Sequence, residues 1–264
     1  MTLPPNPTYL LVDAHVHLHD CFDLSQFLDA AKANFQQQSD RLKLDQPAIG
    51  ILLLAEVKGV NAFAQLVSQQ QQLNQQLSSW EIAPTQEALS LRLTHSSGQT
   101  LLIMAGRQVV TQEGIEVLAL MTDGMLADGL SLKTTLERAI ALNSLPVLPW
   151  GVGKWLGKRG QLVEAGLESS PHTLFAGDNG GRPSFWPLPN FCKRQLPGTD
   201  PLPLAYEVER PGSFGFATQA NLDWDKPGES LKQALSHSNT NIQAYGRAQT
   251  PWRFLKNQSL LRLR

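Results

Sequence analysis

The alternation of strand and helix patterns along the chain constrains its fold more than any other feature of the sequence. Ile49–Ala55 is a continuous apolar run of the kind that a parallel sheet buries on both faces. By contrast, Asp23–Phe35 and Ser131–Asn143 repeat apolar residues at helical spacing, and Ser131 is a typical helix N-cap. Because strands and helices alternate through most of the chain, we expect an α/β fold with a mainly parallel sheet. Further strands are expected at Tyr9–His17, Glu116–Met121, Pro146–Pro149 and Thr173–Gly177, and further helices at Val60–Leu77, Trp155–Leu167 and Glu229–Leu235.

One segment departs from this alternation. Polar and apolar residues alternate with a period of two along Ala88–His95, Ser96–Gln99 is a typical turn, and Thr100–Ala105 is again mostly apolar. This pattern predicts a β-hairpin as a local addition to the main sheet. We find no linker and no internal repeat, so we expect residues 1–264 to form a single domain, a size that one α/β domain can reach.

Composition argues against several classes of protein. The formal net charge of -1 gives no long-range field that would attract nucleic acid or anionic lipid. No apolar run approaches the length of about 18–20 residues that a membrane span needs, and Met1–Asn6 lacks the basic start of a signal peptide. Two cysteines, Cys21 and Cys192, make no disulfide framework in a chain of this length. We therefore expect a cytoplasmic protein that binds neither nucleic acid nor membranes.

A cluster of histidines at the end of the first predicted strand is the strongest chemical feature. Histidines alternate with apolar residues along Asp13–Asp20, so the side chains of His15 and His17 project to the same side, about 6–7 Å apart along the backbone. Two neutral imidazoles at a strand end can converge on one divalent ion. His19 and Glu56, the latter at the end of the second strand, are weaker candidate ligands. Alternatively, these histidines only form hydrogen bonds with the backbone where the strand ends.

This opening strand resembles the first motif of the PHP (polymerase and histidinol phosphatase) superfamily and, more loosely, that of the amidohydrolase superfamily. The PHP resemblance spans roughly residues 8–217. It implies a distorted (β/α)7 TIM-type barrel, with the predicted hairpin as an elaboration. Later segments extend it. Ala105–Val110 and Gly114–Leu120 are similar to the family's paired strands, and Leu145–Gly151 is similar to an apolar strand of the family. Leu196–Pro201 is similar to a glycine-serine-aspartate motif, and Gly212–Gly215 is similar to the family's segment after that motif.

The resemblance implies a set of metal ligands. His15, His17 and Asp200 match positions where the family has ligands. Gln108 stands where the family has a glutamate, so the resemblance implies a weaker, neutral oxygen donor at that position.

Two further positions depart from the family's pattern. Trp150 replaces a histidine that precedes proline in the family, and Glu116 falls near a position where the family often has histidine. Tryptophan cannot bind a metal, whereas three or four ligands suffice for one ion. The resemblance therefore implies an altered site with a single divalent ion (Zn, Mn or Fe) in place of the family's two or three.

Two glycine-rich loops carry candidate catalytic residues. In Phe175–Pro183, paired glycines let the backbone approach a ligand, and Asp178 and Arg182 supply opposite charges. In Trp150–Gly160, Lys154 and the backbone N–H groups could hold a phosphate or carboxylate at a helix N-terminus. The alternatives are a tight turn that these side chains stabilise and a flexible loop with solvated lysines.

The sequence alone leaves three functions open. The first is a metal-dependent hydrolase that acts on a small anionic phosphoester through a metal-activated water. The second is a catalytically degenerate PHP-like domain that binds a small molecule or a protein partner, as the replacements at Gln108 and Trp150 would allow. The third is an amidohydrolase-type enzyme for C–N bonds, for which we find neither a matching lysine nor matching later histidines.

Overall fold

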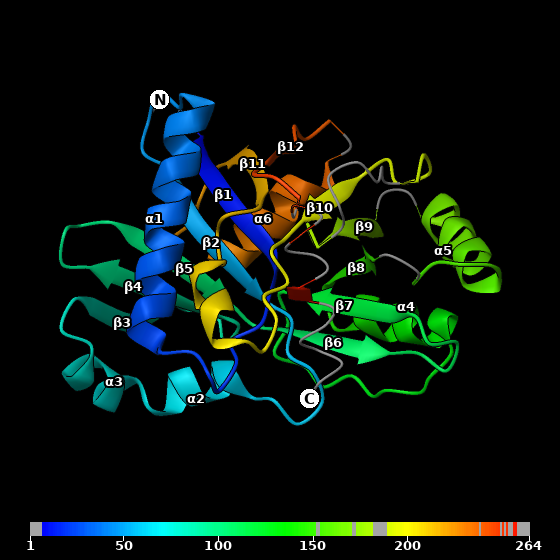
Figure 1. Ribbon diagram of the computed structural model, residues 1–264, viewed down its shortest axis with the longest axis horizontal. Coiled ribbons are helices and arrows are strands. Elements are labelled where there is room, and N and C mark those ends of the chain that lie inside the picture. Colours follow the sequence, from blue (N-terminus) through cyan, green and yellow to red (C-terminus); the bar gives the residue numbers. More distant parts are fainter. Residues whose placement is uncertain are drawn as a thin grey trace.

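The computed structural model describes residues 7–151, 154–170, 173–181, 189–237, 239–248, 250, 252 and 256–257 of the chain. Its strands form two sheets (Figure 1). The seven-stranded sheet has the order β12 (Gln243–Tyr245), β11 (Gly215–Ala220), β1 (Thr8–Val16), β2 (Ile49–Leu54), β5 (Thr100–Met104), β4 (Ser90–His95), β3 (Trp80–Pro84). The five-stranded sheet has the order β10 (Gln195–Pro197), β9 (Phe175–Asp178), β8 (Leu145–Trp150), β7 (Glu116–Leu120), β6 (Gly106–Val110). The helices are α1 (Leu24–Leu42), α2 (Ala62–Ser68), α3 (Gln70–Gln76), α4 (Leu132–Ala141), α5 (Lys158–Ser169), α6 (Pro227–Ser236) and the 3-10 helix η1 (Ala205–Glu209).

The TIM-type barrel that the PHP resemblance implies is wrong, because the described strands form two separate mixed sheets and no closed barrel. A (β/α) barrel needs parallel strands joined by helical crossovers. Here β1, β2 and β5 run parallel, as do β8, β9 and β10, but β6 and β7 form an antiparallel pair. In addition, β11 pairs antiparallel with β1 from Thr8 to Val12. An isolated bridge between Glu56 and Arg107 connects the two sheets.

The predicted hairpin is confirmed, since β4 and β5 pair antiparallel across the turn between His95 and Thr100. Two predicted helix starts are also confirmed. The side chain of Asp23 accepts a hydrogen bond from the backbone of Gln26 at the start of α1, and Ser131 accepts one from Thr134 at the start of α4.

The single helix expected at Val60–Leu77 is instead two short helices that meet at Gln69. The glutamine-rich second helix, α3, buries no residue. Its side chains cover the backbone of strand β3: Asn74 both donates to the carbonyl of Ile82 and accepts from its N–H, at 2.9 and 2.8 Å. The side chain of Gln70 donates to the same carbonyl. Polar contacts with the edge strand β3 therefore determine where α3 lies. Helical periodicity in the sequence does not predict such contacts.

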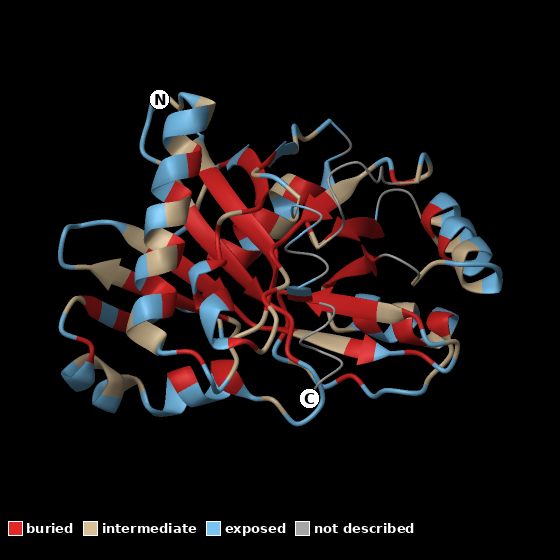
Figure 2. Ribbon diagram, viewed as in Figure 1, coloured by how far each residue is buried: buried red, intermediate tan, exposed pale blue. Residues whose placement is uncertain are grey.

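Apolar side chains fill three layers around the two sheets, and Figure 2 shows that the central strands are mostly buried while the outer sides of the helices are exposed. One layer lies between α1 and the larger sheet, and another covers the smaller sheet beneath α4 and α5. The third combines residues of both sheets with Leu231 and Leu235 of α6. None of the described helices is long and apolar enough to cross a bilayer.

Candidate metal centre

His15, near the end of β1, and His17, just beyond it, point their ring nitrogens at a common place. The two Nε2 atoms lie 3.1 Å apart. Asp200, three residues after β10, brings Oδ1 to 3.2 Å from His17 Nε2 and 3.5 Å from His15 Nε2. Gln108 of β6, in the five-stranded sheet, places Oε1 3.0 Å from His15 Nε2. Four donors from three parts of the chain thus converge.

These separations suit a metal site. Ligand atoms about 2.0–2.2 Å from an ion at tetrahedral angles lie about 3.3–3.6 Å from one another. The separations among His15, His17 and Asp200 are close to that range, and the three ligand atoms all lie within 4.8 Å of one another. His15 Nε2 faces three polar atoms at once, more than one N–H group can serve. These three residues could therefore hold one metal ion, with Gln108 beside them.

The backbone around Asp200 is shaped for this approach. Asp200 has a φ of 44°, in the left-handed region that costs a residue other than glycine some strain. Its N–H donates to the carbonyl of His15 at 2.7 Å, which holds the loop against β1. A Cβ on Gly198 would lie 2.2 Å from the backbone nitrogen of His15, so only glycine allows this close contact. The glycine-X-aspartate spacing thus places the carboxylate beside the histidines.

Asp13 connects the strand of the histidines to the loop of Asp200. It is fully buried, and its carboxylate accepts hydrogen bonds from the N–H and hydroxyl of Thr199, at 2.8 and 2.6 Å. It also accepts one from the N–H of Gly212 at 2.8 Å. The sequence pattern indicated Asp13 only as the residue before the histidine pair. Its contacts show that it holds together the backbone on which both histidines and Asp200 depend.

The protonation states match those of metal ligands. Burial lowers the pKa of His15, so the imidazole stays neutral and its nitrogen free to bind an ion. Burial alone would raise the pKa of Asp200, but the neighbouring His15 and His17 and the ammonium of Lys154 hold it well below its ordinary value. Asp200 is therefore an ionised carboxylate, the form that binds cations.

Behind Asp200 lies a chain of polar contacts that the sequence did not reveal. The side-chain amide of Asn179 donates to Asp200 Oδ2 at 3.0 Å. Arg210 donates to the carbonyl of Asn179 at 3.4 Å and pairs with Glu207 at 3.2 Å; both charged residues are buried. The amide leaves Asp200 Oδ1 to face the histidines. Groups that orient a ligand in this way are common behind metal sites.

We expect that replacing Asn179 by alanine weakens metal binding roughly 10–100-fold, because Asp200 loses the donor that orients it. The dissociation constant measured by competition with a chelator checks this. Asn241→Ala, a change at an exposed position, is the matched control and should leave the constant unchanged. An equally unchanged constant for Asn179→Ala would show that Asp200 needs no such support.

Lys154 and Glu116 form an ion pair next to the cluster. Lys154 Nζ lies 2.6 Å from Glu116 Oε2, and both side chains are partly exposed. Both charges act on the pKa of His15. Lys154, predicted as an anion-binding residue, is therefore a positive charge in the neighbourhood of the centre.

The structure places the weaker ligand candidates around the centre rather than in it. Glu56 accepts a hydrogen bond from the N–H of Phe63 at 2.6 Å and pairs with Arg107 at 2.7 Å. His19 contacts the carbonyl of Pro201 through Nε2 at 2.9 Å and stacks on the ring of His17. The side chain of Glu56 is thus engaged elsewhere, while His19 supports the ring of a ligand.

The second glycine-rich loop is described only in part. Asp178 is buried at the end of β9 and accepts a hydrogen bond from the N–H of Gly180 at 3.0 Å. This contact agrees with the alternative of a tight turn. Arg182 lies outside the described residues. Trp150, at the end of β8, is buried and pairs in register with Asp178.

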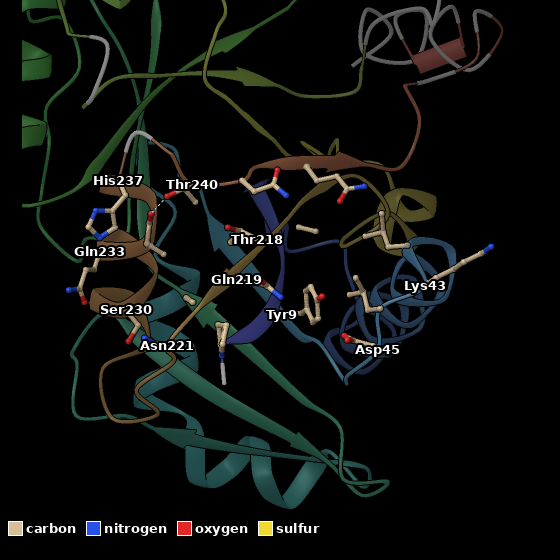
Figure 3. A pocket seen from close by; sticks show the side chains of 18 residues that line it. Tyr9, Lys43, Asp45, Thr218, Gln219, Asn221, Ser230, Gln233, His237 and Thr240 are labelled. Atoms are coloured by element: carbon tan, nitrogen blue, oxygen red, sulfur yellow. Dashed lines mark hydrogen bonds between the residues drawn. The ribbon is translucent and has the colours of Figure 1, made fainter. Parts of the chain in front are cut away.

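A hollow of about 920 Å³ lies away from this centre (Figure 3). Lys43 and Asp45 line one side of it, His237, just after α6, lines the other, and Tyr9 and Gln219 lie between them. Tyr9 lies near the start of β1, and the histidines lie near and just beyond its end, so the hollow and the metal centre lie at opposite ends of that strand. The hollow shares no lining residue with the metal centre, so it adds nothing to that site.

Comparison with known proteins bears on the fold alone. No model of a known protein family matches this sequence, and no curated protein matches it. The fold is similar to that of PsfC from Pseudomonas syringae PB-5123, for which a crystal structure is known. The alignment covers 98% of this chain and 98% of PsfC, with a TM-score of 0.52 and 16% sequence identity. At that identity, the likeness shows the architecture and says nothing of the chemistry.

Proposed function

We propose that this chain is a metal-dependent hydrolase of the PHP-like type that acts on a small anionic phosphoester. The observation that carries the proposal is the convergence of His15, His17 and Asp200 on one place, with Gln108 beside them. The proposal rests on this site and on the motifs that resemble the PHP superfamily, and does not depend on a barrel. Three protein ligands leave one position open, as hydrolytic sites require.

Each residue of the centre has a separate role in this chemistry. A divalent ion held here would lower the pKa of a bound water to about 7 and polarise a phosphoryl oxygen. His15 and His17 offer imidazole nitrogens, and Asp200 supplies the negative charge that retains a cation. Lys154 attracts the anionic group of the substrate. Imidazole, carboxylate and amide donors suit Zn, Mn or Fe, so we propose a single ion of one of these metals.

A second candidate is a catalytically degenerate domain that binds a small molecule. Trp150 favours it, because a buried indole that cannot bind metal ends a strand neighbouring the centre. Both candidate functions include a bound metal ion, but only the hydrolase turns over a substrate. We propose the cytoplasm as the location for either.

We expect the purified protein to contain about one metal ion per chain and to hydrolyse aryl phosphate esters when Mn²⁺ or Zn²⁺ is supplied. Elemental analysis and an assay of a panel of aryl phosphate monoesters and diesters check this. Treatment with a chelator should abolish turnover, and the metal should restore it. Bound metal without turnover across the panel would favour the binding domain, and a protein that takes up no metal would refute both candidates.

A further inference from the structure

The ion pair of Lys154 and Glu116 lies on the same side of the smaller sheet as the metal centre. Glu116 pairs with Val110 across β6 and β7, and Gln108 lies two residues before Val110. Paired residues, and residues two apart on a strand, project to the same face, so Gln108 and Glu116 share a face. Gln108 contacts His15 there. The carboxylate of Glu116 and the ammonium it holds are therefore neighbours of the ligands.

The side chains of this pair are accessible to a ligand. Lys154 exposes 39% of its side chain and Glu116 exposes 21%. Glu116 shares its face of the sheet with Gln108, which contacts His15, and Lys154 lies 2.6 Å from Glu116. A charged group bound at the centre will therefore be subject to both charges.

On the basis of the function proposed above, we propose that Glu116 is a specificity-determining residue that restricts the substrate to a monoanion, such as a phosphodiester. Two neutral imidazoles leave the charge of a divalent ion unchanged, Asp200 and Glu116 each subtract one charge, and Lys154 adds one. With a divalent ion bound, the centre formed by these described residues would thus carry one net positive charge. A monoanionic diester balances it, whereas a dianionic monoester brings a surplus negative charge close to Glu116.

Several other buried charges in the described part of the chain are compensated locally. Glu56 is paired with Arg107, and Glu207 with Arg210. The carboxylate of Asp13 is enclosed by donors of the backbone and of Thr199, which compensate its charge locally.

Binding of a size-matched pair of unreactive ligands tests the proposal. Phenylphosphonate carries two negative charges at mildly alkaline pH, and its monomethyl ester carries one. Calorimetry on the metal-loaded protein should show tighter binding of the ester. In Glu116→Gln, the dissociation constant of phenylphosphonate should fall roughly tenfold relative to that of the ester, because one repulsive charge is removed. Glu164→Gln, which removes an exposed carboxylate on α5, should leave the ratio unchanged.

A second variant and a second readout separate this proposal from the hydrolase itself. Lys154→Met should shift the ratio the opposite way, because binding of the dianion loses more from removal of a positive charge. Turnover of bis(p-nitrophenyl) phosphate against p-nitrophenyl phosphate should follow the same pattern. Unchanged ratios in both variants would overturn the role of Glu116 and leave the hydrolase standing. Metal-loaded protein that cleaves neither ester would refute the hydrolase, while the calorimetric ratios would still decide the charge preference.

Discussion

His17→Ala is expected to lose metal and hydrolysis together. The imidazole of His17 lies 3.1 Å from the ring nitrogen of His15 and 3.2 Å from the carboxylate of Asp200, so its removal leaves two strong donors and the amide of Gln108. Loss of a ligand from so small a set should weaken metal binding by more than the roughly 10–100-fold expected for a supporting residue. Elemental analysis after gel filtration should find less than about a tenth of the wild-type metal content, and ester hydrolysis should fall to background.

The fold should survive this change, because His17 lies just beyond the end of β1 and keeps 12% of its side chain exposed. Circular dichroism should be unchanged. His95→Ala is the matched control: His95 lies on β4, contacts Lys32 and Ser97, and takes no part in the metal cluster. It should retain full metal and turnover. If folded His17→Ala protein keeps the metal content of the wild type, the ion binds elsewhere.

Local patterns predicted the elements whose periodicity reflects their own burial. Helix α1 has its capping Asp23 and a buried face at helical spacing, and β2 is buried almost throughout. Strand β11, by contrast, was not predicted. Its residues Gly215–Ala220 are buried at five of six positions and show no alternation that would mark a strand. Its antiparallel pairing along β1 depends on contacts far apart in the sequence, and this pairing is one of those incompatible with the predicted barrel.

The residues of the candidate site also fall into those that local sequence patterns predict and those that they do not. Strand alternation predicts that His15 and His17 act together, because the relation between them is local. Asp200 came from the resemblance, and its closeness to the histidines depends on Gly198 packing against the backbone of His15. No sequence pattern predicted a role at the site for Asn179 or Arg210. The contact of Asn179 with Asp200 and that of Arg210 with Asn179 arise only when β9, β10 and η1 are brought together in the folded chain.

The largest loss of stability is expected for Asp13→Ala. Burial raises the pKa of Asp13 to about 6 even though Thr199, Gly212 and His15 donate hydrogen bonds that favour the carboxylate. At neutral pH the group is therefore ionised, and its donors compensate the charge. Alanine would leave the N–H and hydroxyl of Thr199 and the N–H of Gly212 buried without an acceptor. At about 1–3 kcal/mol for each unsatisfied group, less the relief of no longer burying a charge, we expect a net loss of about 3–5 kcal/mol.

Urea unfolding, followed by circular dichroism, measures this loss, and two further variants interpret it. Asp13→Asn keeps one acceptor oxygen and should cost less than alanine. Asp20→Ala, at an exposed turn just after the histidines, should change the free energy of unfolding by less than about 0.5 kcal/mol. Because Thr199 lies next to Asp200, Asp13→Ala should also lower metal affinity in the fraction that remains folded. A free energy of unfolding within about 1 kcal/mol of wild type would show that the loop keeps its place without Asp13, and that Gly198 and the hydrogen bond from Asp200 to His15 suffice to assemble the centre.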